Sequence, residues 1–178
     1  LKDLFNNPFF IEILKSQILN NKNLNALINF NVKNIYDFDR FSDLSLNLKI
    51  EEGNYNFSNS NILWKENVKV LFSDAFLNFD QEKINLNGRT SFEVRNEDEF
   101  YKFFQIKKEL RKNIEKIELD FNYDFNEEKI IFNNLRIDNK SNKKIEEIVS
   151  NFNSSNKKFL NKIIFKNFVN DILIAYFG

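Results

Sequence analysis

Three adjacent carboxylates, Glu97-Asp98-Glu99, form the densest group of side chains that could do chemistry in this chain. Clustered carboxylates can hold a divalent metal ion or share acid–base work. These three follow Asn96 and open a helical pattern, where such residues usually cap the helix and complement its macrodipole. Glu127-Glu128 lies at the tip of a predicted hairpin, where exposed charge is ordinary. We therefore expect neither group to be a catalytic or metal site.

Most of the residue types that enzymes use for catalysis are missing. The chain has 178 residues with 0 Cys and 0 His, which removes thiolate nucleophiles, serine–histidine pairs and the usual zinc and haem ligands. Its 26 Lys and Arg balance 26 Asp and Glu, so no net basic field attracts nucleic acid. We expect a protein that is not an enzyme, needs no cofactor and binds no nucleic acid.

Lys157, Lys158, Lys162 and Lys166 form a basic stripe on a predicted amphipathic helix. Such a stripe suits a helix that docks at a membrane or at an envelope partner. The pattern is more typical of the solvated face of a helix that packs on a sheet, which is the interpretation that we favour. The sequence leaves both interpretations open.

Helices flank and interrupt a long run of predicted strands. Helices are expected over residues 8–20 and 143–177, antiparallel strands over 24–137, and an inserted helix over 97–113. We interpret residues 1–178 as a single domain or as the C-terminal fragment of a larger protein.

Two glycines bear on the strand register. A turn at Glu52-Gly53 or at Gly53-Asn54 would keep the apolar face in phase, and the sequence does not choose between them. Asn87-Gly88 has the composition of a hairpin turn, but that turn would mix the two faces. We therefore predict one long strand with Gly88 at a bend or bulge, and a second bulge where the phase slips at Asn133-Asn134.

Alternation in these strands gathers apolar side chains on one face, which must be buried either in a dry core or against a ligand. The residues of this predicted apolar face are Leu44, Leu46, Leu48, Ile50, Tyr55, Phe57, Ile84, Leu86, Phe92, Val94, Leu119, Phe121, Tyr123 and Phe125.

The order of these segments resembles the C-terminal part of AsmA-like proteins. The stretches that carry the resemblance are "FSDLSLNLKIEEGNYNFSNSNILW", "VKVLFSDAFLNF", "KINLNGRTSFEV", "DEFYKFFQIKKELRKNIEKIELDFNYDF" and "KIIFNNLRID", which span roughly Phe41 to Asp138. Gly53 and Gly88 match two glycine positions of that family. Its members are bacterial envelope proteins of repeated antiparallel strands, with a groove implicated in moving phospholipids toward the outer membrane.

The resemblance implies an α+β, strand-dominated fold. It would be a curved antiparallel β-sheet, forming an open groove or half-barrel, with an N-terminal helix, one inserted helix and C-terminal amphipathic helices. It also implies a periplasmic location, with an inner-membrane anchor upstream. The chain begins at Leu1 and contains no Met, so we expect that anchor to lie outside it.

The implied function is phospholipid transport or outer-membrane homeostasis and biogenesis, with phospholipid acyl chains on the apolar face. A structural or protein-binding β module with a closed dry core is the alternative. A soluble carrier of a small apolar ligand is the third interpretation.

Overall fold

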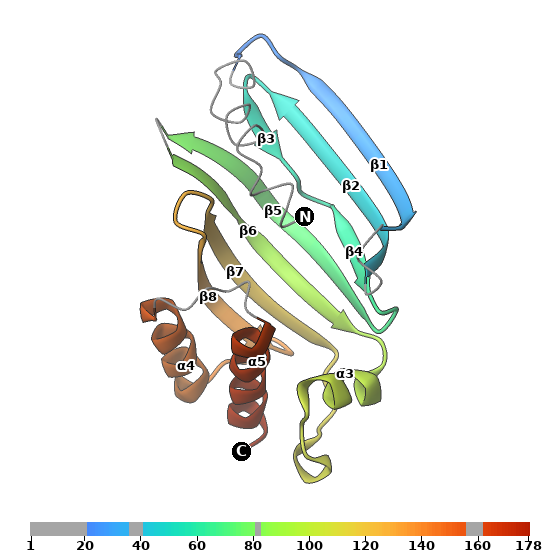
Figure 1. Ribbon diagram of the computed structural model, residues 1–178, viewed down its shortest axis with the longest axis vertical. Coiled ribbons are helices and arrows are strands. Elements are labelled where there is room, and N and C mark those ends of the chain that lie inside the picture. The colour runs from blue at the N-terminus through green and yellow to red at the C-terminus, as the bar shows by residue number, and fades with distance from the viewer. Residues whose placement is uncertain (1–20, 36–40, 81–82, 156–161) are drawn as a thin grey trace.

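The computed structural model describes residues 21–35, 41–80, 83–155 and 162–178, so the helix expected over 8–20 lies outside the described residues. The strands are β1 (Ala26–Asn34), β2 (Phe41–Glu51), β3 (Asn54–Asn56), β4 (Asn61–Trp64), β5 (Val68–Asp80), β6 (Lys83–Val94), β7 (Lys116–Asp124) and β8 (Lys129–Ile137). The helices are α3 (Glu97–Phe104), the 3-10 helix η1 (Lys108–Leu110), α4 (Lys143–Ser154) and α5 (Lys162–Phe177). Strands β1 to β6 come first along the described chain, followed by α3 and η1, then by β7 and β8, and finally by α4 and α5 (Figure 1).

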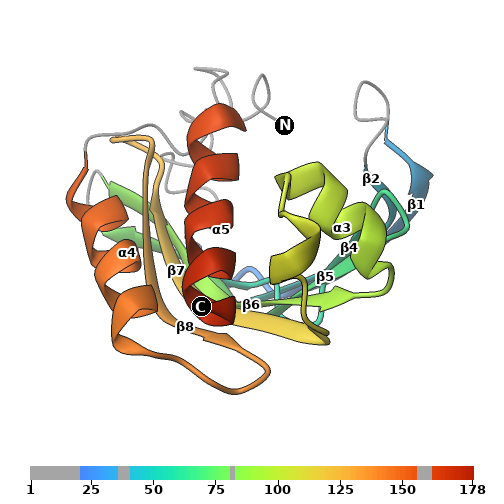
Figure 2. The ribbon, with the colours of Figure 1, turned by 90° about the horizontal axis from the view of Figure 1, so that it is seen from below.

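The strands form one curved antiparallel sheet of eight strands, in the order β1-β2-β3-β5-β6-β7-β8. The short strand β4 also lies between β2 and β5, so β3 and β4 share one position in the sheet. Figure 2 shows α3 and α5 on one side of the sheet and α4 beside β8. The predicted fold class, strand-dominated α+β with a curved antiparallel sheet, is confirmed.

Two serine hydroxyls bridge the break between β3 and β4. Ser60 Oγ accepts a hydrogen bond from the backbone N–H of Asn47 in β2 at 3.0 Å, and Ser58 Oγ accepts one from Ala75 in β5 at 3.1 Å. These side chains satisfy backbone donors that a continuous strand would otherwise pair. The sheet therefore stays connected across the interruption.

The β2–β3 hairpin uses the first of the two predicted turns. Ile50 pairs with Tyr55 and Glu51 with Asn54, which leaves Glu52-Gly53 as the two-residue turn. Both turn residues have positive φ, 51° and 78°, as a type I′ turn requires. This turn keeps the apolar side chains of both strands on one face.

Strand β6 runs straight through Gly88, as predicted, but the bulge is on the neighbouring strand. Arg89 pairs with Ser73 and Asn87 with Phe76, so Gly88 faces the two residues Asp74-Ala75 of β5. Gly88 therefore lies at a bulge, as predicted, and the extra residue of that bulge is on β5. The glycine is explained by close approach, because a Cβ there would lie 2.8 Å from Ala75 Cα.

The second predicted bulge is confirmed in β8. Glu118 pairs with Arg136 and Asp120 with Asn133, so Leu119 of β7 faces two residues, one of which is Asn134 with φ of 52°. The extra residue restores the apolar phase at the end of the strand.

The bulge also completes an ion-pair network around Asp120 on the other face of the sheet. Asp120 accepts hydrogen bonds from Arg89 Nε at 2.7 Å and from Asn134 Nδ2 at 2.6 Å. Burial opposes ionisation of Asp120, but these two hydrogen bonds outweigh it and lower the pKa of the carboxyl. The network links β6, β7 and β8.

Replacing Asp120 with Asn is expected to lower the free energy of unfolding at neutral pH by less than about 1 kcal/mol, because the pair is partly solvated. A depressed carboxyl pKa stabilises the fold above the pKa of the unfolded chain, about 4 for Asp, and this stabilisation is lost as the pH falls through the folded pKa. The difference between the native and D120N proteins should therefore shrink in acid. Denaturant titrations at several pH values measure it, and a difference that grows in acid contradicts the assignment.

The helix predicted over 97–113 ends early, at Phe104. Gln105 is left-handed, with φ of 59°, and its N–H and that of Ile106 bond back to the last turn of α3. Beyond η1, the Arg111 guanidinium donates to the Ile106 carbonyl oxygen at 3.0 Å and holds a compact loop. Apolar side chains at helical spacing suggested a continuous helix. Instead, the chain reverses direction after Phe104, and Ile106 and Ile114 are buried from the loop that follows.

The helical prediction for 143–177 is confirmed for α4 and α5, and residues 156–161 lie outside the described residues. Asn142 caps α4 by accepting from the Ile145 N–H at 2.9 Å. Asn96 caps α3 in the same way, accepting from the Glu99 N–H at 3.2 Å.

Helix α4 seals the β8 edge of the sheet through one side chain. The backbone N–H of Phe132 donates to Asn153 Oδ1 at 2.9 Å, and Asn153 Nδ2 donates to the Phe132 carbonyl oxygen at 2.7 Å. The amide thus imitates a neighbouring strand at the point where β8 has none.

Replacing Asn153 with Ala is expected to lower the free energy of unfolding by about 1–3 kcal/mol, because it leaves a part-buried donor and acceptor unpaired. Denaturant unfolding measures this loss. Asn151 is exposed on the same helix and provides the matched control, for which N151A should have little effect. Equal losses for the two variants would show that Asn153 does not seal the edge.

Candidate functional site

Helices cover much of the predicted apolar face. The helix-covered core joins buried residues of β5, β7 and β8 to buried residues of the helices, namely Phe100, Tyr101 and Phe104 of α3, Ile145, Val149 and Phe152 of α4, and Phe168, Ile172, Leu173 and Phe177 of α5. From the predicted face it includes Leu119 and Phe121 as buried residues, with Leu86, Phe92 and Val94 packed against it. On this part of the sheet, protein side chains occupy the place that acyl chains would take.

A second cluster buries another part of the predicted face. It consists of Ile50, Tyr55, Leu77 and Ile84, and the partly buried Leu48, Phe57 and Phe125 pack against it. Tyr123 is half-buried next to this cluster, with its ring centroid 4.9 Å from that of Phe125. Burial raises the pKa of the Tyr55 hydroxyl, which therefore stays protonated at neutral pH.

Leu44, Leu46 and Tyr123 are the three residues of the predicted face that belong to neither cluster, and of these Leu44 and Leu46 lie on β2 beside the edge strand β1. Leu46 pairs with Phe30 of β1 and Leu44 with Val32, which brings a second row of apolar side chains beside them. Phe30 is 54% exposed and Val32 37% exposed. We call Ile28, Phe30, Val32, Leu44 and Leu46 the open face.

Within the described residues, the open face is the part of the apolar surface on β1 and β2 that belongs to neither core cluster. The alternation of Ile28, Phe30 and Val32 predicts the strand correctly but does not reveal that it is exposed. The neighbouring Leu27 points to the other side of β1 and is 70% exposed. Leu27 therefore offers an apolar comparison for the open face within the same strand.

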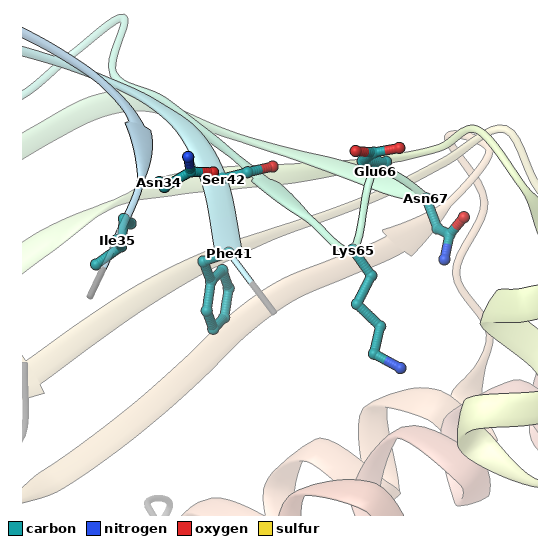
Figure 3. Close-up of a pocket in the computed structure, with 7 residues that line it drawn as sticks. All are labelled: Asn34, Ile35, Phe41, Ser42, Lys65, Glu66 and Asn67. Carbon is teal, nitrogen blue, oxygen red and sulfur yellow. The ribbon is translucent and has the colours of Figure 1, made fainter. Parts of the chain in front are cut away.

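A hollow of about 670 Å³ lies where β1 and β2 approach the β4–β5 turn. Its lining residues are Asn34, Ile35, Phe41, Ser42, Lys65, Glu66 and Asn67. Figure 3 shows Phe41 and Lys65 pointing from the sheet toward the side where the helices lie. Phe41 pairs with Trp64 across the strands, so the hollow adjoins both the open face and the helix-covered core.

The basic stripe is only partly described, since Lys157 and Lys158 and the side chain of Lys162 lie outside the described residues. Lys166 is half-buried, with Nζ 4.6 Å from the centroid of the Phe103 ring. Asn170, one turn on, donates to the Phe104 carbonyl oxygen at 2.8 Å. This side of α5 therefore packs on α3.

The acidic groups act as caps and ion pairs in the described part of the chain. Glu99 is 2.7 Å from Lys102 Nζ, and Asp98 lies 3.7 Å from Arg111. Among the described residues, no group of three or more acidic side chains could hold a metal ion. None of the helices described is both long and apolar enough to cross a membrane.

The chain was compared with protein-family models, with curated proteins and with solved structures. None of the three comparisons gave a match.

Proposed function

We propose that this chain is a non-catalytic, AsmA-like module that binds phospholipid acyl chains on the open face and contributes to lipid transport in the bacterial envelope. The proposal rests on one observation: helices cover one part of a single apolar surface and leave another part exposed. Helices cover that surface over β5 to β8, whereas Phe30 and Val32 of β1 remain exposed beside Leu44 and Leu46. The proposal places the module in the periplasm, anchored to the inner membrane by an upstream segment.

The open face suits a long apolar ligand. Phe30 with Leu46 and Val32 with Leu44 form two successive apolar pairs along β1 and β2, and Ile28 with Leu48 extends them toward the second cluster. An acyl chain gains free energy in proportion to the apolar area it removes from water, and its headgroup can stay solvated. Contiguous exposed apolar surface of this kind marks a site for a lipid or a protein partner.

A photoreactive amino acid at position 30, compared with one at position 27, tests the proposal. In the full chain expressed in bacteria, irradiation should attach phospholipid at position 30 and not at position 27, although Leu27 is the more exposed. Mass spectrometry of organic extracts and of the labelled protein identifies the lipid. No co-purified phospholipid together with no labelling at position 30 would exclude lipid binding here, and equal labelling at both positions would show non-specific contact.

A structural or protein-binding module remains the second candidate, and the open edge of β1 favours it. Among the described strands, β1 pairs only with β2, and its other side has no partner strand. An extended segment of another protein could add there by backbone hydrogen bonds. Because an added strand contacts both faces of its neighbour, it would crosslink to positions 27 and 30 alike, whereas lipid would label position 30 alone.

Docking of the C-terminal helix at a membrane or an envelope partner stays a prediction. The apolar stripe of α5, which includes Phe168 and Ile172, is already occupied within the helix-covered core.

A further inference from the structure

The β4–β5 turn holds Lys65 in an unusual backbone conformation. Lys65 and Glu66 both have left-handed φ values, 50° and 60°, which is rare for two consecutive residues other than glycine. The conformation is held in place by Asn67, whose N–H donates to the Trp64 carbonyl oxygen at 3.0 Å and whose carbonyl oxygen accepts from the Arg95 N–H at 2.7 Å. Strained residues that the surroundings fix in this way are concentrated at functional sites.

The turn separates a positive from a negative side chain. Figure 3 shows Lys65 pointing toward the helices and Glu66 pointing to the opposite side. Both residues line the hollow, but the two side chains leave the turn in opposite directions, so the Lys65 ammonium points away from the Glu66 carboxylate.

A second lysine approaches the same place from α5. Lys65 Nζ lies 5.7 Å from the centroid of the Phe103 ring, and Lys166 Nζ lies 4.6 Å from the same centroid. The ring attracts both ammonium groups and thereby positions two cations from distant parts of the chain around one side chain.

Neither lysine forms an ion pair within the described part of the chain. Glu99 is the acid most affected by them: Lys102, and more weakly Lys65, lower its pKa. Its carboxylate is already paired with Lys102 Nζ at 2.7 Å. No carboxylate of the described residues thus forms an ion pair with either ammonium group.

Apolar side chains continue from this pair of lysines to the open face. Phe103 contacts Trp64 edge-on, with centroids 4.6 Å apart, and Trp64 pairs with Phe41 at the start of β2. Leu44 and Leu46 follow on the same strand. A ligand with a charged end and apolar chains would match this order of surfaces.

We propose that Lys65 and Lys166 bind the phosphate of an anionic phospholipid whose acyl chains lie on the open face. This inference rests on the proposed function and adds the class of lipid and the position of its headgroup. The hollow next to Lys65, lined also by Ser42 and Asn67, receives the polar remainder of the headgroup.

Two soluble short-chain lipids with the same acyl chains test the headgroup site in the full chain. We expect dihexanoyl phosphatidylglycerol to bind more tightly than dihexanoyl phosphatidylcholine, in calorimetric titrations below their micelle concentrations. Each lysine near the lipid phosphate is expected to contribute about five-fold to this affinity. The double variant K65Q/K166Q should therefore lose about 25-fold for phosphatidylglycerol and little for phosphatidylcholine.

The charge-matched control is K107Q/K108Q, which removes two exposed lysines that follow α3 and leaves the Lys102–Glu99 pair intact. It should keep the preference for phosphatidylglycerol, as should K65R/K166R, which retains both charges. Thermal unfolding of all variants checks that they remain folded.

Each of the other possible results of these titrations contradicts a specific part of the proposal. Equal binding of the two lipids, or equal losses in K65Q/K166Q and K107Q/K108Q, overturns the headgroup site and leaves the acyl-chain proposal standing. Binding of neither lipid overturns the proposed function as well. If inorganic phosphate alone binds in a Lys65-dependent and Lys166-dependent manner while neither lipid does, the site takes a free anion and the lipid assignment is wrong.

Discussion

Replacing Phe121 with Asp unfolds the protein, and the same replacement at Phe30 leaves it folded. Phe121 is 9% exposed and belongs to the helix-covered core, where its ring lies 6.3 Å from that of Phe72. A carboxylate buried there without a partner costs several kcal/mol, which is comparable with the whole stability of a domain. Phe30 is 54% exposed, so an Asp there stays in water.

Circular dichroism and thermal unfolding of F121D and F30D measure this contrast. Because both variants replace Phe with Asp, F30D is the matched control for F121D. A cooperative transition retained by F121D would mean that this part of the sheet is a groove wall and not a closed core. F30D should in addition lose the co-purified phospholipid, which separates loss of binding from loss of folding.

Replacing Gly88 with Ala lowers the free energy of unfolding by about 1–3 kcal/mol, as overpacking of a close contact usually does. The new Cβ would lie 2.8 Å from Ala75 Cα, 2.9 Å from Ala75 Cβ and 3.2 Å from the Phe121 ring. Strand propensity alone predicts the opposite sign, because glycine inside a strand is unfavourable. Denaturant unfolding decides which effect is larger.

The double variant G88A/A75G should recover part of this loss. Removing the Ala75 side chain eliminates the 2.9 Å contact but leaves the contact with its Cα, so recovery is incomplete. A double-mutant cycle that includes A75G alone isolates the interaction. A stabilising effect of G88A, or no coupling between the two positions, would contradict the explanation of Gly88 by close approach.

Much of the strand arrangement follows from the phase of apolar residues. The path of β6 through Gly88, the bulge in β8 and the fold class were predicted from alternation or resemblance and are confirmed. A bulge at Gly88 was also predicted, but the sequence did not show that its extra residue lies on β5, because a glycine in sequence does not show which partner comes close. The end of α3 was missed because Gln105 adopts a left-handed conformation that its side chain does not signal.

The apolar face shows a different limit. Alternation identifies residues that share one face, but it does not identify what covers them. Leu46 and Phe121 have the same pattern in sequence, yet Phe121 packs in the helix-covered core and Leu46 belongs to neither cluster. The difference depends on where the helices dock, which involves contacts between distant parts of the chain.

The headgroup site could not be inferred from sequence for the same reason. Lys166 was recognised as part of a basic stripe, whereas Lys65 had no distinguishing neighbour. Phe103 brings the two lysines together, although they come from a turn and a helix that are far apart in the chain.

The unequal edges of the sheet imply unequal resistance to local opening. Strand β8 is held by β7 on one side and by Asn153 of α4 on the other, whereas β1 is held by β2 alone. Since β1 keeps Phe30 and Val32 exposed, detaching it uncovers less apolar surface than opening the helix-covered core would. Amide hydrogens of β1 therefore exchange with solvent through partial opening, while those of β7 exchange only when the whole domain unfolds.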